Sequence, residues 1–569
     1  MFEPLLPVQF LRRAARLFPD KPAVIDGEHR HTYRQLEERV NRLSNALRQR
    51  GIGKGDKVAV LSPNSHRMLE AFFAVPQVGA VLTPLNYRLT TPDFAYILEH
   101  AETQALLIDW EYAHQIAPLV ERLTSLRHYL LLRDDETPSA VLPAVDYEDA
   151  LAAVSADCPE PPAIDETDLA TLNYTSGTTA RPKGVMLTHR ACTINAIHFM
   201  TALNVRPTDV YLHTLPMFHA NGWGGIWALA GLGGTQVCLR RVEAQPIFEL
   251  MQNEAITLAC AAPTVLVTLA TFDAARDYRL AAGVRIGTGG AAPAAAVLRR
   301  MEDLGIEIVH LYGLTETGPF LTSCEAQPAW DGLDVQARYR LKARQGIAQL
   351  FADVRVMDDQ LCEVPMDGKT VGEIVARGNN VMEGYYKQPE ETANVMRGGW
   401  FHTGDLAVVH PDGYIEVVDR LKDVIISGGE NISSVEVESM LYEHPAVLEA
   451  AAYGVPSEYT EEDVAVSVAL RPGHELTADE LLDYCRGRMA RYMVPLFVRF
   501  LDMLPKTPTE KVEKTTLRRW HLRALADRKG HKHGEEKYGK HYRNCKRLWR
   551  EHCSGRWRYS CRSTNKGWR

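Results

Sequence analysis

One stretch of the sequence combines the residue types that are needed to hold a polyphosphate. Residues 174–184 read YTSGTTARPKG, which places four hydroxyls, a flexible glycine and two cations in one short segment (Thr175, Ser176, Gly177, Thr178, Thr179, Arg181 and Lys183). Glycine lets the backbone approach an anion closely, and consecutive N–H groups in a bend form an anion-binding concavity. The spacing differs from the Walker pattern, because Gly184 follows the lysine where Ser or Thr would be required. The segment predicts a phosphate-binding loop, with a solvated surface turn as the alternative.

Further motifs follow this loop along the chain: GGAAP (289–293), YGLTETGP (312–319), GEIVARG (372–378), GYY (384–386), GWFHTGD (399–405), DRLKDVIISGGENIS (419–433) and LPKTPTEKV (504–512). Together with the first loop they resemble the ordered motifs of the adenylate-forming (AMP-binding) superfamily, over residues 10–520. The resemblance is greatest to medium- and long-chain fatty-acyl-CoA synthetases. It implies an ATP-dependent acid–CoA ligase that proceeds through an acyl-adenylate and releases AMP and pyrophosphate.

The resemblance also implies where ATP and its cation bind. The first loop would hold the β- and γ-phosphates, Tyr312 would stack on adenine, and Asp405 and Arg420 would bind the ribose. Glu316 would hold Mg²⁺, a hard cation that prefers oxygen ligands. The nucleotide-binding set is Thr175, Ser176, Gly177, Thr178, Thr179, Lys183, Gly290, Ala291, Tyr312, Gly313, Thr315, Asp405 and Arg420.

Catalysis and domain movement are assigned by the same resemblance. Lys511 would reach the α-phosphate and the attacking carboxylate, with Glu316 and Lys183 as the other catalytic residues. Lys506 and Lys514 are the alternatives to Lys511. Lys422 matches the hinge about which the small domain turns between the two half-reactions, and Gly428, Gly429 and Glu430 match the segment that meets the pantetheine arm of coenzyme A. Ala180 and Glu510 depart from the family pattern, which usually has glycine at both positions.

The segment LPMFHANGWGG (215–225) matches the acyl pocket of the family. His219 would face the substrate, and Trp223 falls where a tryptophan gates the acyl tunnel of some long-chain enzymes; ordinary core packing is the alternative for both. A medium- or long-chain fatty acid is therefore the expected substrate. The alternatives are a carnitine-like, branched or aromatic carboxylate, a stand-alone adenylation enzyme that loads a carrier protein, and a non-catalytic nucleotide-binding protein.

The elements that must position these residues follow from hydrophobic spacing. Residues 34–51 place Leu36, Val40, Leu43 and Leu47 at helical intervals, 57–63 read as a buried strand, and 66–86 read as a helix followed by a strand. This alternation predicts a large layered α/β domain. After residue 350 short strands dominate, with Asp412-Gly413 as a hairpin signal.

The predicted fold is thus a large N-terminal layered α/β domain with a small mobile α+β C-terminal domain. The predicted boundaries are 1–419 for the AMP-binding domain, 420–520 for the mobile catalytic domain, and 521–569 for a basic, disordered tail outside the resemblance. The tail holds 15 basic against 4 acidic residues, whereas the whole chain carries a net charge of −8. The remainder is therefore acidic, which argues against nucleic-acid binding as the main function.

Composition narrows the remaining classes. Apolar residues make up 46% of the chain and charged residues 24%, as in globular proteins. The ten cysteines form no CxxC pair, which argues against a zinc site built on cysteines and against a disulfide framework. The glycine-rich run 222–239 is predicted to be buried rather than transmembrane. A cytoplasmic enzyme follows as the expectation, acting on a small-molecule carboxylic acid, without nucleic acid or a transmembrane segment, and with a homodimer as the oligomer to be tested.

Overall fold

The computed structural model describes residues 3–134, 141–160, 162–175, 181–293, 295–427, 430–457, 460–507 and 511–530, the last six of these as backbone only. The chain divides into two compact units, Met1–Glu513 and Lys514–Arg569. In the second unit the structure describes one helix, α16 (Lys514–Gly530). Among the described residues no helix combines the length and apolar character needed to cross a membrane.

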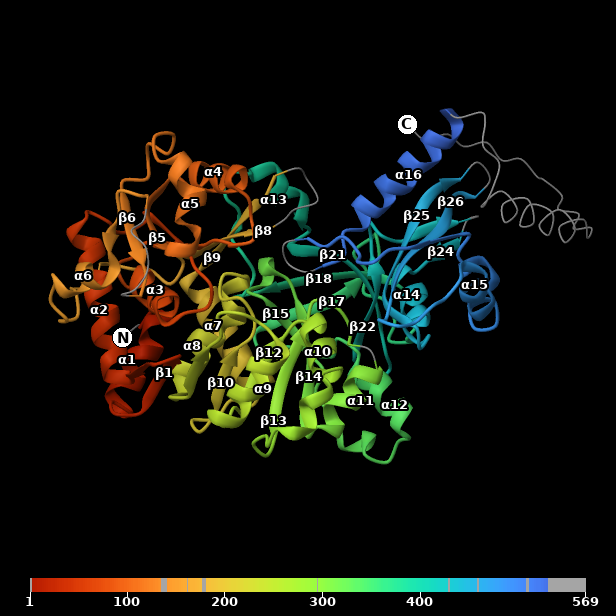
Figure 1. Cartoon of the computed structure of the whole chain (residues 1–569), viewed down its shortest axis with the longest axis horizontal. Coiled ribbons are helices and arrows are strands. Elements are labelled where there is room, and N and C mark those ends of the chain that lie inside the picture. Colours follow the sequence, from red (N-terminus) through yellow and green to blue (C-terminus); the bar gives the residue numbers. More distant parts are fainter. Residues whose placement is uncertain are drawn as a thin grey trace, which may run out of the picture. The chain divides into compact units, whose positions relative to one another are not determined.

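Two large sheets form the first part of the chain (Figure 1). The described strands of the first sheet follow the order β16 (Ile347–Ala348), β15 (Phe320–Ser323), β14 (Ile306–Gly313), β13 (Val284–Gly289), β12 (Leu258–Ala261), β10 (Val210–His213), β11 (Thr235–Cys238), β1 (Pro22–Asp26), β2 (His29–Thr32). Those of the second follow the order β19 (Gly384–Tyr385), β9 (Lys183–Thr188), β8 (Leu169–Thr175), β4 (Val81–Pro84), β3 (Lys57–Leu61), β5 (Thr103–Asp109), β6 (His128–Leu132), β7 (Val145–Asp146).

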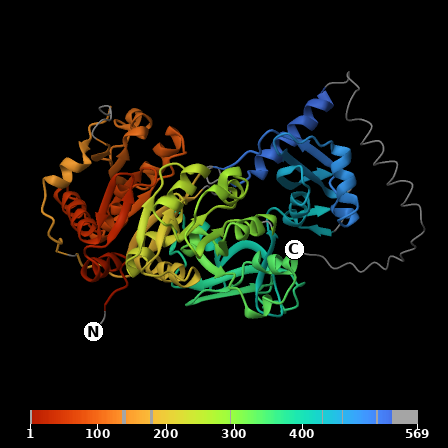
Figure 2. The same cartoon turned by 60° about the horizontal axis from the view of Figure 1, so that its bottom comes forward.

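Apolar residues on both faces of the strands explain the layering. In β3, Val58 and Val60 belong to one buried cluster, whereas Ala59 and Leu61 belong to another. Successive side chains of a strand point to opposite faces, so each face of the second sheet needs its own cover. Helices α2 (Tyr33–Gln49) and α3 (His66–Gln77) cover one face, and α4 (Thr91–His100) and α5 (Ala113–Ile116) cover the other. Figure 2 shows the red and orange strands between these helices.

The largest core cluster joins the two sheets. It contains residues of both sheets together with α2, α3, α7 (His189–Ala202) and α8 (Gly225–Leu232), so these helices form a shared middle layer. The far face of the first sheet is covered by α9 (Ala244–Asn253), α10 (Pro263–Ala270) and α11 (Ala295–Asp303), which lie beside β12, β13 and β14 in Figure 1. The other helices of this region are α1 (Val8–Leu17), α6 (Tyr147–Ala152), α12 (Val335–Lys342) and α13 (Pro389–Val395).

Two small sheets follow. The described strands of one are β17 (Ala352–Met357), β18 (Gly372–Gly378), β21 (Trp400–Val409), β20 (Met396–Arg397) and β22 (Ile415–Arg420). Those of the other are β24 (Glu430–Ile432), β23 (Ile425–Ser427), β26 (Glu461–Leu470), β25 (Val447–Ser457) and β27 (Phe497–Phe500), with α14 (Ser434–Tyr442) and α15 (Ala478–Arg486). The expected fold class is confirmed.

Local sequence signals placed several elements correctly. All four leucine and valine positions of the first predicted helix lie in the core through α2. Asp412-Gly413 joins the antiparallel strands β21 and β22 as a hairpin, with Gly413 at φ 82°. The run 222–239 forms buried structure around α8 and β11. Ser433 caps α14, because its side chain accepts a hydrogen bond from the backbone N–H of Glu436.

Candidate active site

The two ends of the predicted phosphate loop lie on adjacent strands. β8 ends at Thr175 and β9 begins at Lys183, and these two residues are paired across the antiparallel ladder. The Lys183 ammonium forms an ion pair of 2.5 Å with Glu391 of α13 and lies 5.0 Å above the ring of Tyr385. Ser176, Gly177, Thr178 and Thr179, together with Ala180, lie outside the described residues.

Tyr385 connects this lysine to the predicted magnesium ligand. Tyr385 lies on β19, which pairs with β9 so that Tyr385 faces Val185 across the ladder. Its hydroxyl donates a hydrogen bond of 2.9 Å to Glu316 Oε1. Burial, together with the nearby Glu316 carboxylate, raises the pKa of Tyr385, so this phenol stays protonated and remains a donor. One tyrosine thus contacts both Lys183 and Glu316.

A second tyrosine holds the predicted ribose ligand. Tyr312, on β14, donates a hydrogen bond of 2.8 Å to Asp405 Oδ2. Asp405 Oδ1 lies 3.3 Å from Arg420 Nε, because β21 and β22 pair in a register that sets these residues opposite each other. Asp405 is buried. A carboxylate has about four lone-pair positions, so Asp405 retains acceptor capacity for a ligand.

Two glycines allow the strands to come close here. A Cβ atom at Gly289 would lie 2.5 Å from the carbonyl oxygen of Leu311, and one at Gly313 would lie 1.7 Å from that of Pro319. Neither position has space for a side chain, so both motifs require glycine for close backbone approach. Gly290, the next residue of the first motif, lies beside Lys511: a Cβ built there would be 3.8 Å from Lys511 Cε.

Lys511 therefore lies among residues from distant motifs. Lys511 is an exposed residue, although many protein atoms lie around its ammonium. Loss of hydration, followed by repulsion from Arg420, lowers the pKa of Lys511 to about 8, and the attraction of Asp405 and Glu316 opposes this change. Lys506, the alternative lysine in the same segment, forms an ion pair of 2.6 Å with Glu449 instead.

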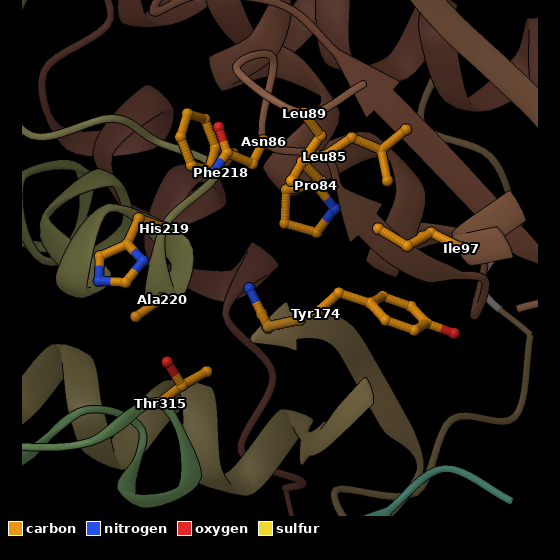
Figure 3. A pocket seen from close by; sticks show the side chains of 11 residues that line it. Pro84, Leu85, Asn86, Leu89, Ile97, Tyr174, Phe218, His219, Ala220 and Thr315 are labelled. Carbon is orange, nitrogen blue, oxygen red and sulfur yellow. The ribbon is translucent and has the colours of Figure 1, made fainter. Parts of the chain in front are cut away.

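His219 lines a small cavity next to this group. Figure 3 shows His219, Ala220 and Thr315 along one side, with Pro84, Leu85 and Ile97 along another. The cavity measures about 20 Å³, which is space for about one water molecule. Burial, then the positive charges of Lys511 and Arg88, lowers the pKa of His219 to about 4. This histidine is therefore neutral at neutral pH.

The segment after His219 adopts an unusual backbone. Residues 220–224 all have positive φ, including Asn221 at 57° and Trp223 at 60°. Buried amides hold this turn: Asn195 Nδ2 donates to the Trp223 carbonyl at 3.0 Å, and Asn173 Nδ2 donates to Asn221 Oδ1 at 2.9 Å. A left-handed run of this kind persists only where surrounding contacts fix it, and such strain concentrates at functional sites.

Most of the predicted site residues that the structure describes lie close together. Lys183, Glu316, Tyr312, Asp405, Arg420, Lys511, Gly290 and His219 are joined by the contacts above, and Thr315 lines the cavity of His219. Ala291 follows Gly290, Glu430 begins β24, and Lys422 is exposed between β22 and β23. Trp223 packs edge-on against Phe320 and is not among the cavity-lining residues. Gly428, Gly429 and Glu510 lie outside the described residues.

Sequence reasoning did not assign the residues that hold the site. Tyr385 was part of a recognised motif, but its contacts with Lys183 and Glu316 could not be read from the chain. Glu391 has no sequence signal of its own. The asparagines that fix the turn 220–224 come from three separate segments, and the glycines at 222, 224 and 225 are the one local signal that could have pointed to an unusual backbone there.

Comparison with known protein families identifies the family to which this chain belongs. The profile of the AMP-binding enzyme family matches residues 11–386, and that of the AMP-binding enzyme C-terminal domain matches residues 436–511. The chain belongs to the AMP-binding enzyme family. It is an AMP-forming acid–CoA ligase, and the resemblance of the motifs to the AMP-binding superfamily is confirmed.

Curated relatives match over nearly their whole length. The chain is 42% identical over 520 residues to 4-hydroxybutyrate–CoA ligase 2 of Metallosphaera sedula, which covers 90% of this chain and 94% of that protein. It is also 42% identical over 537 residues to the peroxisomal acetate/butyrate–CoA ligase AAE7 of Arabidopsis thaliana, with the same coverage. Among solved structures, ATP-bound MatB from Rhodopseudomonas palustris is similar with a TM-score of 0.78 and 28% identity, over 90% of this chain and 99% of that one. ATP binding by this AMP-binding enzyme is thereby supported.

Proposed function

We propose that this ligase joins a short-chain carboxylic acid to coenzyme A in two steps at one site. A carboxylate oxygen attacks the α-phosphorus of ATP and pyrophosphate leaves. The thiolate of coenzyme A then attacks the acyl carbon of the adenylate, and AMP leaves with the bonding electrons. The observation that carries this proposal is the position of Lys511 among Gly290, Glu316, Asp405 and Arg420.

The first step needs fixed positive charge, since negative groups must approach each other. Lys511 is proposed to stabilise the α-phosphate and the incoming carboxylate, and Lys183 the β- and γ-phosphates. In the present structure Glu391 neutralises Lys183. Triphosphate oxygens would replace this carboxylate, and the ring of Tyr385 would keep the ammonium in place through a cation–π contact.

The site residues fit the remaining cofactors. Glu316 accepts a hydrogen bond from Tyr385 at one oxygen, so it retains acceptor positions that would bind Mg²⁺ beside the phosphates. Asp405 would accept the ribose hydroxyls, and Tyr312 would lie against the adenine. Glu430, with Gly428 and Gly429, is proposed to meet the pantetheine arm of coenzyme A in the second step.

The relatives favour a small acid over a medium- or long-chain fatty acid. Their names specify 4-hydroxybutyrate, acetate and butyrate. The cavity beside His219 is small, and Ala220, the first residue of the strained turn 220–224, lines it. A ligase for another carboxylate, the alternative noted from the sequence, is therefore better supported. Trp223 would limit the depth of the pocket from its packed position rather than open a tunnel.

The test compares carboxylic acids that differ in chain length, branching and aromatic character as substrates. AMP and pyrophosphate release would be measured with coenzyme A and acetate, butyrate, 4-hydroxybutyrate, 2-methylpropanoate, benzoate, octanoate and palmitate. We expect kcat/KM to be highest for one of the acids with four carbons or fewer. The highest kcat/KM with palmitate or octanoate would contradict the short-chain proposal, and ADP as the product would contradict the whole mechanism.

Tyr385→Phe is expected to lower the adenylation rate by about 10-fold, because it removes the hydrogen bond that orients Glu316 but keeps the ring beneath Lys183. The deficit should shrink as the Mg²⁺ concentration rises. Tyr386→Phe is the control, since Tyr386 contacts Glu102 and Lys387 rather than the site. An unchanged Mg²⁺ dependence in Tyr385→Phe would contradict the orienting role.

Three further assignments remain predictions. The domain limits 1–419, 420–520 and 521–569 are retained as proposed functional boundaries, although α16 runs to Gly530. Residues 531–569 of the proposed tail lie outside the described residues. Cytoplasmic location and a homodimer are likewise proposals, and the Arabidopsis relative is named peroxisomal.

A further inference from the structure

A cluster of histidines and carboxylates lies on elements that the active site does not use. His29 and His31 are on the edge strand β2, and His66 and Glu70 are on α3. The ring of His66 lies 4.8 Å from that of His29 and 5.3 Å from that of His31. Ligand atoms of His31, His66 and Glu70 all lie within 4.8 Å of one another.

The spacing of these residues explains the cluster. Residues two apart on a strand point to the same face, so His29 and His31 project together. Residues four apart on a helix lie one turn above the other, so His66 and Glu70 share one face of α3. Asp26, on β1, completes the group from the neighbouring strand.

Each of these two histidines has a ring nitrogen that could coordinate a metal. Asp26 Oδ2 lies 2.8 Å from His66 Nδ1, an arrangement in which a carboxylate holds the ring and leaves Nε2 as the coordinating atom. His31 Nε2 is buried and has no hydrogen-bond partner among the residues that the structure describes.

Glu70 supplies an oxygen with spare capacity. Its side chain is fully buried, and its carboxylate accepts bonds from Arg39 and from the Tyr147 hydroxyl. Three of its roughly four lone-pair positions are thus used, and one remains for a metal. Arg39 would stay bound beside a cation, because Glu148 also holds it at 2.9 Å.

The surrounding charges favour a cation. Asp26, Glu70, Asp134 and Glu148 are linked to the cluster through ion pairs, several of which involve the guanidinium groups of Arg39 and Arg67. The carboxylates therefore outnumber the guanidinium groups by two among these residues. Glu70 is fully buried, whereas Glu148 and Asp134 have side-chain exposures of 41% and 66%, so the buried negative charge that a divalent ion would offset is that of Glu70.

We propose that His31, His66 and Glu70 bind a divalent cation of the zinc type that joins β2 to α3. Two imidazole nitrogens and a carboxylate oxygen form a common zinc ligand set, with His29 or water in the fourth position. Tetrahedral zinc separates ligand atoms by about 3.3 Å, so ligand atoms that now lie within 4.8 Å of one another would have to move closer on binding. His31 also lines a surface pocket with Gln35 and Arg39, which gives the ion an access route.

The test uses the full-length chain, freed of metal by a chelator and then titrated with Zn²⁺ by calorimetry. The wild type should bind one equivalent of Zn²⁺ more than the His31→Gln/His66→Gln double variant. The single His31→Gln variant should bind Zn²⁺ at this site at least about 100-fold more weakly than the wild type does. His114→Gln, at an exposed histidine of α5, is the matched control and should bind as the wild type does.

The absorption spectrum of bound Co²⁺ distinguishes metal held at this site from metal held by the cysteines near the C-terminus. The difference spectrum between wild type and the double variant should show the visible bands of a tetrahedral site without the thiolate charge-transfer band. Zn²⁺ should also raise the melting temperature of the wild type and of His114→Gln, but not that of His31→Gln. Equal zinc stoichiometry in wild type and both histidine variants would overturn the proposal, as would a wild type that binds no zinc. If the double variant does not fold, the single variant gives the same decision.

Discussion

Lys511→Ala is expected to reduce acyl-adenylate formation by about 10²–10³-fold, the usual effect of removing a preorganised charge from a transition state. The reason is its position beside Gly290, with Glu316, Asp405 and Arg420 close enough to affect its pKa. Pyrophosphate exchange dependent on the acid would measure this step alone. Lys506→Ala is the matched control, because Lys506 is engaged with Glu449, and its rate should stay within a few-fold of the wild type.

The second half-reaction gives the contrast. When preformed acyl-adenylate is supplied, Lys511→Ala should still make thioester with coenzyme A, because the proposed domain rotation removes this lysine from the site in that step. An equal loss in both half-reactions would count against the rotation. A greater loss in Lys506→Ala than in Lys511→Ala would mean that the catalytic lysine is misassigned.

The pH profile checks the same residue independently. The lysine acts as a cation, and its pKa in the free enzyme is lowered to about 8. It is protonated below that value and loses its charge as the pH rises through it. For adenylation, kcat/KM for ATP reports the free enzyme, so it should fall above pH 8. Lys511→Arg, which stays charged, should remove this fall even if its maximal rate is lower.

Lys422→Pro is expected to lower the rate of thioester formation by about 10²-fold or more, whereas adenylation should continue. Lys422 is exposed in the short connection between β22 and β23, where a hinge would have to change its backbone angles. Proline fixes φ near −65°, so only conformations compatible with that angle would remain. Acyl-adenylate should accumulate on the enzyme, as measured by rapid quench with labelled acid.

Lys422→Ala separates the backbone effect from the loss of charge. Alanine leaves φ unrestricted, so this variant should form thioester at close to the wild-type rate. If alanine and proline are equally damaging, Lys422 acts through its ammonium and not as a hinge. If the proline variant turns over at the full rate, the connection is not where the domain rotates.

Which residues of different motifs contact each other is determined by the tertiary structure. Glu316 and Tyr385 are 69 residues apart and Lys183 and Glu391 are 208 apart, yet each pair is in contact. These contacts depend on strand order, since β19 pairs with β9 at the edge of the second sheet. Hydrophobic periodicity specifies that a segment is a strand and which of its faces are buried, but it does not specify the neighbour.

The acyl pocket shows the same limit. The segment 215–225 matches the acyl pocket of the family, and the structure shows that part of it forms a left-handed turn fixed by Asn173, Asn195 and Asn221. Backbone conformation there results from buried amide hydrogen bonds between separate segments. Residue types alone therefore gave no measure of the pocket's size.

The sequence by itself determined the fold class, the family and the reaction, because nucleotide chemistry requires particular residue types within short segments and each motif carries its own. Gly289 and Gly313 are examples, since only glycine permits the close backbone contacts found there. The tertiary structure alone decided the partners of Lys183, Glu316 and Lys511, the dimensions of the cavity beside His219, and the meeting of β2 with α3. Those features depend on packing between segments far apart in the chain, and no local pattern encodes such distances.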